Sequence, residues 1–205
     1  MIDLLDPIRH SPKLPDLIRE LEAYWQAEQE KRHAFWADHD EGQKAEFIEG
    51  EIIYHSPVYG RHWKVSTQIL RYLIPYVYEH QLGDVAVEKV MIRCTRNDYE
   101  PDICFWTLEK SQNFQLKQSA FPPPDFIIEI LSESTEARDR GIKMTDYALH
   151  GVQEYWLIDA DNQALEQYLL QGEAFVLNQK LKSGAIASQV ITGFEISLAQ
   201  LFEGF

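Results

Sequence analysis

Cysteine is scarce in this chain, and long apolar runs are missing. The two cysteines in 205 residues, Cys94 and Cys104, do not have the spacing of a metal site. We expect both to be reduced thiols of a cytoplasmic protein. No apolar stretch is long enough to cross a bilayer. The first residues contain acids and no basic segment typical of a signal peptide, so we expect no membrane partner.

Positive charge is also scarce. The chain has 19 lysines and arginines against 33 acids, a formal net charge of -14. This balance counts against a large basic surface for nucleic acid. It does not exclude a small cleft in which a metal ion supplies the positive charge. The sequence also lacks a glycine-rich phosphate loop, a serine nucleophile elbow and a zinc-type spacing, which removes three common classes of site.

The chain begins with a predicted long helix, from about residue 13 to residue 37. Its apolar residues recur at helical spacing: Leu14, Leu17, Ile18, Leu21, Tyr24 and Trp25. We expect this helix to pack on the body of the protein or on a second subunit. We therefore divide the chain into an N-terminal helical extension, residues 1–37, and a domain of residues 38–205.

The remainder predicts a mixture of strands and helices. After a loop at Asp38 to Gly42, a hairpin is expected from Glu46 to Tyr54, and a helix from His62 to His80 in which Pro75 introduces a kink or an early end. A polar loop or an extended arm is expected at 107–121, and a helix at 136–149. The expected strands cover residues 85–92, 102–106, 126–131, 155–159, 165–170, 174–177 and 186–190, and a short helix covers 198–202.

Two acids stand in runs that otherwise read as buried strands. Glu129 interrupts the apolar run of residues 126–131, and Asp102 follows Pro101 at the start of another. A buried carboxylate is costly unless a cation pairs with it or a metal takes it as a ligand. With Lys143 on the following helix, the two acids could hold a divalent ion such as Mg²⁺ and activate water for phosphodiester cleavage.

Each supporting residue also has a structural explanation. Lys143 shares a predicted helix face with Asp139 and Tyr147, and it could simply form a solvated pair with Asp139. Glu46 could complete an acidic cluster or be an exposed strand acid. His62 could contact a phosphate or orient water, or it could be an ordinary residue of a helix end or core.

The order of these residues resembles a bacterial family of putative restriction endonucleases in the PD-(D/E)XK nuclease superfamily. The segments that carry the likeness lie between about Phe35 and Phe202: Glu46 to Gly50, Pro101-Asp102, Glu129 to Ser132, Lys143 to Tyr147, and Gly151 to Asp159. The resemblance implies an α/β restriction endonuclease-like fold, with a mixed central sheet flanked by helices.

The resemblance also implies a site. Asp102 and Glu129 match the two motif acids, and the implied ligands of Mg²⁺ or Mn²⁺ are these acids and the Ile130 carbonyl. The motif lysine should lie two residues after the second acid, where this chain has Leu131. Lys143 is the implied replacement, and Glu46 would be an auxiliary acid.

The leading hypothesis is therefore a metal-dependent endonuclease that acts on nucleic acid, most simply DNA. Such nucleases often act as homodimers, because cutting both strands needs two sites. A second hypothesis is a catalytically weak or inactive nuclease-like module that binds a protein or nucleic acid. A third is a structural acidic pair, in which a permanent Arg or Lys partner of Glu129 fills the space of the metal.

Overall fold

The structure is a computed structural model that describes residues 5–38, 43–57 and 59–205. Its helices are α1 (Asp6–Arg9), α2 (Leu14–Asp38), α3 (Gly60–Glu79), α4 (Leu108–Ser111), α5 (Glu136–Arg138), the π-helical turn η1 (Asp139–Lys143), α6 (Met144–Leu149) and α7 (Leu198–Leu201). No helix in these residues is both long enough and apolar enough to span a membrane.

The strands form three sheets. They are β1 (Ala45–Ile48), β2 (Glu51–Tyr54), β3 (Gly83–Val87), β4 (Met91–Arg93), β5 (Asp98–Tyr99), β6 (Ile103–Thr107), β7 (Ala120–Phe121), β8 (Phe126–Ile130), β9 (Glu154–Asp159), β10 (Ala164–Gln171), β11 (Ala174–Leu181), β12 (Ala185–Ala187) and β13 (Glu195–Ser197). The central six-stranded sheet has the order β11-β10-β9-β8-β6-β3. It is mixed, because β8 and β9 are parallel whereas the other neighbours are antiparallel.

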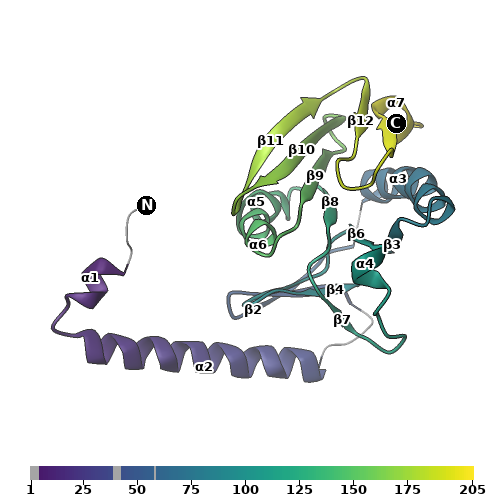
Figure 1. Cartoon of the computed structure of the whole chain (residues 1–205). Helices are drawn as coiled ribbons and strands as arrows, with labels where there is room; N and C mark the ends of the chain where they lie inside the picture. Colours follow the sequence, from purple (N-terminus) through teal and green to yellow (C-terminus); the bar gives the residue numbers. More distant parts are fainter. Residues whose placement is uncertain (1–4, 39–42, 58) are drawn as a thin grey trace.

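The central sheet has a different cover on each face. On one face, Ile128 and Trp156 pack into a core with residues of α3 and α7. On the other face, Ile127 and Leu157 pack with Tyr147 of α6 and with residues of the second sheet. That second sheet has five short strands in the order β2-β1-β5-β4-β7, and Figure 1 shows it lying between the central sheet and α2. The acid on β8, Glu129, must therefore face one of two packed layers.

Most of the predicted elements are confirmed. The long N-terminal helix is α2, and the expected hairpin is β1–β2, which turns at Glu49 and Gly50 with positive φ angles of 50° and 85°. Pro75 does not end α3, which continues to Glu79. Most of the loop expected at Asp38 to Gly42 lies outside the described residues.

Three local predictions are wrong. The single strand expected at 85–92 is two strands in different sheets, because Glu88 and Lys89 both have a positive φ of 40° and redirect the chain. The loop expected at 107–121 contains α4 and β7. The strand expected at 186–190 is β12, which ends at Ala187. It pairs with β13, a strand that the sequence pattern did not predict.

Candidate active site

The antiparallel register of β6 and β8 brings the two predicted acids together. Ile103 pairs with Ile128, so Asp102, one residue before β6, lies beside Glu129. The Asp102 N–H donates to Glu129 Oε2 at 3.2 Å, and the Ile130 N–H donates to Asp102 Oδ2 at 2.9 Å. Both carboxylates are buried. The prediction that neighbouring strands place these acids side by side is confirmed.

Lys143 points at this pair. Its Nζ lies 3.0 Å from Glu129 Oε1, 2.9 Å from Glu46 Oε1 and 3.2 Å from Asp139 Oδ1. The side chain is only 2% exposed, so the alternative of a solvated pair with Asp139 is wrong. The Lys143 ammonium group thus links β1, β8 and the turn at 139–143 through ion pairs with one carboxylate on each.

The π turn η1 sets the position of Lys143. The helix expected at 136–149 is present, but residues 139–143 form a π-helical turn between α5 and α6. Such turns occur often at functional sites. Tyr147, one turn beyond, donates from its hydroxyl to Glu129 Oε1 at 3.1 Å. The face that the sequence predicted for Asp139, Lys143 and Tyr147 is therefore the face turned toward Glu129.

Glu46 is fully buried, which excludes an exposed strand acid. Its Oε1 accepts from the Glu100 N–H at 3.0 Å, and its Oε2 lies 3.1 Å from His55 Nε2. His62 is also part of the site, since its Nε2 lies 2.9 Å from Asp102 Oδ2. Glu46 and His62 are thus brought together with Asp102, Glu129 and Lys143.

The sequence did not predict two basic side chains that contact the acids of this site, Lys44 and His55. Lys44 Nζ lies 2.8 Å from Asp102 Oδ1 with its side chain 14% exposed, and His55 contacts Glu46. Lys44 lies immediately before β1 and two residues before Glu46, so continuing the strand alternation by one residue gives both the same face, a signal that could have found it. No comparable pattern marks His55.

The four carboxylates and two ammonium groups make this cluster net negative. Burial opposes ionisation of Glu46, but Lys143 and His55 outweigh it and lower the pKa of Glu46 to about 2. Burial likewise opposes ionisation of Asp102, yet Lys44 and His62 lower its pKa. Burial raises the pKa of Glu129 to about 8, since the attraction of Lys143 is offset by Asp139 and Asp102. Of these three acids, Glu129 is therefore the one whose negative charge is least compensated by nearby cations.

A cavity of about 390 Å³ opens onto the cluster. Its wall includes both strand acids, the two lysines and Ile130. It also includes residues of the β2–α3 segment, of the loop before α5 and of α5 itself: Tyr54, His55, Tyr59, His62, Ser132, Ser134, Thr135 and Arg138. A substrate group could reach the acids through this opening, and the cavity is large enough to admit a phosphate with water.

The donor set fits a hard divalent cation. Mg²⁺ and Mn²⁺ prefer carboxylate and carbonyl oxygens, and Asp102, Glu129 and the Ile130 backbone lie together on the cavity wall. Within the described part of the chain, the buried oxygens Glu46 Oε2 and Asp139 Oδ1 accept no hydrogen bond, although each lies in an ion pair. Oxygen atoms in such a state could take further positive charge.

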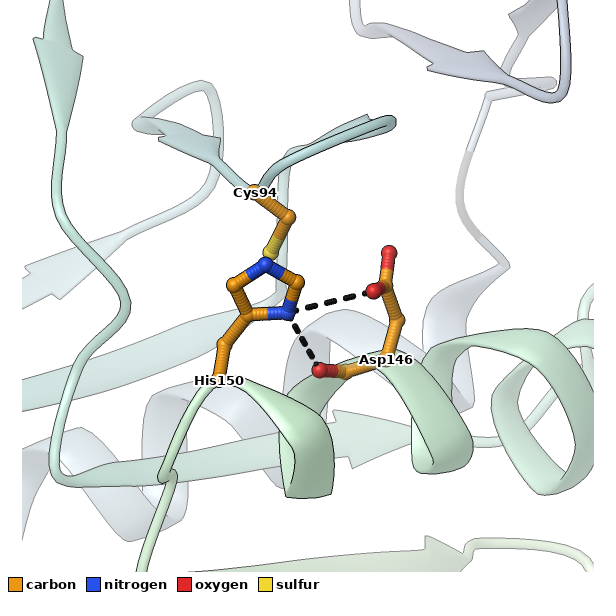
Figure 2. Close-up of side chains that lie close together, drawn as sticks. All are labelled: Cys94, Asp146 and His150. Atoms are coloured by element: carbon orange, nitrogen blue, oxygen red, sulfur yellow. Dashed lines mark hydrogen bonds and ion pairs between the residues drawn. The ribbon is translucent and has the colours of Figure 1, made fainter.

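A second group of possible metal ligands is better explained by hydrogen bonds. Cys94, Asp146 and His150 lie together beside α6 (Figure 2). His150 Nδ1 lies 2.7 Å from the Asp146 carbonyl oxygen, and its Nε2 accepts from the Thr95 N–H at 2.8 Å. Burial raises the pKa of the Cys94 thiol, so thiolate formation is opposed. This group fastens the β4–β5 turn to α6.

Comparison with known proteins decides the family. The chain matches the putative restriction endonuclease family Uma2 over residues 16–199. The chain belongs to this family. The match begins within α2, earlier than the residue near 35 that the sequence likeness suggested. A search of curated proteins gives no match.

A solved structure supports the fold of this Uma2 chain. It is a crystal structure of a putative nuclease belonging to DUF820 from Anabaena variabilis ATCC 29413, with a TM-score of 0.66 and 21% sequence identity. The alignment covers 77% of this chain and 89% of that one. The predicted restriction endonuclease-like fold is confirmed, and the family and fold are those of putative nucleases.

Proposed function

We propose that this Uma2 protein is a Mg²⁺- or Mn²⁺-dependent endonuclease that hydrolyses phosphodiester bonds, with DNA as the substrate. The observation that carries the proposal is the convergence of Asp102, Glu129 and Lys143 at the wall of one cavity. Asp102, Glu129 and the Ile130 carbonyl would hold the ion. A bound divalent ion would neutralise the phosphate and lower the pKa of an attacking water.

The protein groups have separate roles in this proposal. Lys143 would stabilise negative charge as it develops on the phosphate, because its ammonium group is fixed by three carboxylates. Glu46 contacts the Lys143 ammonium group at 2.9 Å and would act as an auxiliary acid. His62 would orient Asp102 and contact the substrate at the cavity wall.

The direction of Lys143 favours this function over a non-catalytic module. A lysine turned toward solvent would have supported the module, but Lys143 is buried against Glu129. The net charge of -14 still favours a substrate contact confined to the cavity. The third hypothesis, a structural acidic pair, required a permanent cation at Glu129, and Lys143 meets that geometric condition. Metal binding is therefore the property that separates the nuclease from the structural acidic pair.

Cleavage assays test the proposal directly. We expect single-stranded and duplex DNA oligonucleotides to be cut in the presence of Mn²⁺ and to stay intact in the presence of a chelator. An Asp102→Asn variant should be inactive under the same conditions. Equal cleavage by this variant would show a contaminating nuclease or a different site, and the absence of cleavage of any substrate would favour the module.

Lys44→Met is expected to strengthen Mn²⁺ binding by on the order of tenfold, equivalent to about 1.4 kcal/mol. The reason is that Lys44 Nζ occupies Asp102 Oδ1, an oxygen that a metal ion would use. Calorimetric titration of the variant measures this change. Lys64→Met is the matched control, because Lys64 is an exposed lysine of α3. Weaker or unchanged affinity would mean that Lys44 does not compete with the ion.

We also propose that the protein acts as a homodimer, since an endonuclease that cuts both strands needs two sites. Support comes from the projecting half of α2, which is described next.

A further inference from the structure

The first half of α2 carries an apolar stripe that its own body leaves open. Figure 1 shows the helix running below the body, with its first half extending beyond β2. Ile18, Leu21, Tyr24 and Trp25 are 44%, 57%, 59% and 43% exposed. These are large values for four neighbouring apolar side chains on one helix, and such a patch marks a contact surface.

The stripe continues a face that is already used for packing. Glu28, Arg32 and Phe35, in the second half of α2, are buried against the body. Arg32 donates to both oxygens of Asp98 at 2.6 and 2.7 Å, and Glu28 accepts from Arg96 at 2.7 and 2.8 Å. The second half of the helix is therefore fixed in place, and it holds the first half in a defined direction.

The open and occupied positions form one heptad pattern. Steps of four and three residues alternate without interruption along the series Leu14, Ile18, Leu21, Trp25, Glu28, Arg32, Phe35. This is the spacing of a seam between two helices. The body covers the last three positions, Leu14 is half-buried, and Ile18, Leu21 and Trp25 stay exposed and need a partner from elsewhere.

We infer that this stripe pairs with the same stripe of a second copy of the chain, with the two helices antiparallel. In this register Ile18 faces Leu21 of the second copy, and Leu14 faces its Trp25. Leu17 and Tyr24, which flank the seam on one side, then also face each other. Apolar residues meet apolar residues at each of these positions.

Antiparallel pairing also suits the positions of the two bodies. A parallel pair would bring the helices together at Glu28, Arg32 and Phe35, where each body already packs on its own helix. In the antiparallel register, Glu28 of one copy lies opposite residue 11 of the other. This point precedes Leu14, the first residue of α2, so the body of one copy lies opposite the α1–α2 turn of the other and not opposite its α2.

The charged residues leave the seam free. Asp16, Arg19 and Glu20 lie on other faces of the helix, and Glu22 would face Pro15 of the second copy, so like charges do not oppose each other there. A two-fold axis between the helices is the symmetry of most homodimers.

Sedimentation equilibrium of the full chain tests this interface independently of nuclease activity. We expect the wild type to be a dimer and the Ile18→Glu/Leu21→Glu variant to be a monomer with an unchanged circular dichroism spectrum. The control is Val176→Glu/Leu177→Glu, which charges two residues of β11 with similar exposure, 44% and 48%, and should stay dimeric. A monomeric wild type, or a dimer that survives the α2 substitutions, would overturn the inference.

Disulfide trapping tests the register. Cys94 and Cys104 are buried, so new thiols on α2 can be oxidised selectively. A mixture of Ile18→Cys and Leu21→Cys proteins should cross-link faster than either protein alone. Equal or slower cross-linking in the mixture would overturn the antiparallel register.

Discussion

Lys143→Met is expected to destabilise the protein by about 3–5 kcal/mol and to abolish cleavage. Lys143 is the shared partner of Glu46, Glu129 and Asp139, all of them buried. Burial alone would lower the pKa of Lys143, but these carboxylates raise it well above its usual value. Removing one partner of a buried ion pair typically costs this much, because an uncompensated charge remains. Urea unfolding at neutral pH measures the loss.

A double variant separates this explanation from simple loss of packing. Lys143→Met/Asp139→Asn has one carboxylate fewer to leave unpaired, so it should regain part of the lost stability. The matched control is again Lys64→Met, which should change the free energy of unfolding by less than about 0.5 kcal/mol, as exposed substitutions usually do. A loss below about 1 kcal/mol for Lys143→Met would contradict the proposed role of Lys143 in holding the cluster together.

Glu129→Gln is expected to reduce cleavage by on the order of a thousandfold, about 4 kcal/mol of activation free energy, without unfolding the protein. Glutamine keeps the size of the side chain but is a poor ligand for a hard cation. The fold should tolerate a neutral group, since the pKa of Glu129 is raised to about 8 and the acid already carries a proton in part of the molecules at neutral pH. Initial rates of oligonucleotide cleavage measure the effect, and Glu109→Gln on exposed α4 is the control.

The raised pKa of Glu129 also determines how the stability of the fold changes with pH. A carboxyl whose pKa is higher in the folded protein stabilises the fold at low pH, and this stabilisation is lost as the pH rises from about 4.5 to about 8. Glutamine does not titrate. Glu129→Gln should therefore gain stability relative to the wild type across this interval. A relative loss with rising pH would show that Glu129 is fully ionised in the folded state.

The sequence was sufficient to predict the residues at the centre of the site, because the patterns that mark them span only a few neighbouring residues. Glu129 and Asp102 interrupt or begin apolar strands, and Lys143 and Tyr147 share one face of a helix with Asp139. These patterns depend on periods of two and of nearly four residues, which survive in any fold. The roles of these residues in metal binding and catalysis stay predictions until binding and cleavage are measured.

The surrounding shell depended on long-range packing, and the sequence predicted it poorly. Lys44 reaches Asp102 because β1 pairs with β5 in the second sheet, and β5 ends at Tyr99, shortly before Asp102. The turn at Glu88 and Lys89 requires two left-handed residues in a stretch that alternates like a single strand. β5 itself has two residues, too few for a periodic pattern.

The N-terminal helix was predicted correctly as a helix, and the structure tests only part of the prediction about its packing. Its apolar residues were expected to pack on the body or on a second subunit. The body buries Glu28, Arg32 and Phe35 but leaves Leu21 and Trp25 exposed, so it does not cover the first half of the helix. The boundary between residues 37 and 38 stays a prediction. The second half of the helix is held by buried ion pairs of Glu28 and Arg32 together with Phe35, and helical periodicity gave no sign of the ion pairs.

The most direct test of the central claim is a calorimetric titration of the wild type and Glu129→Gln with Mn²⁺. The account predicts that the wild type binds the ion at one site and that the variant, with its fold confirmed by circular dichroism, does not. Equal binding by the two proteins would place the metal elsewhere. A folded wild type that binds no Mn²⁺, either alone or with an oligonucleotide present, would show that Lys143 and Lys44 occupy the acids permanently and would contradict the nuclease mechanism.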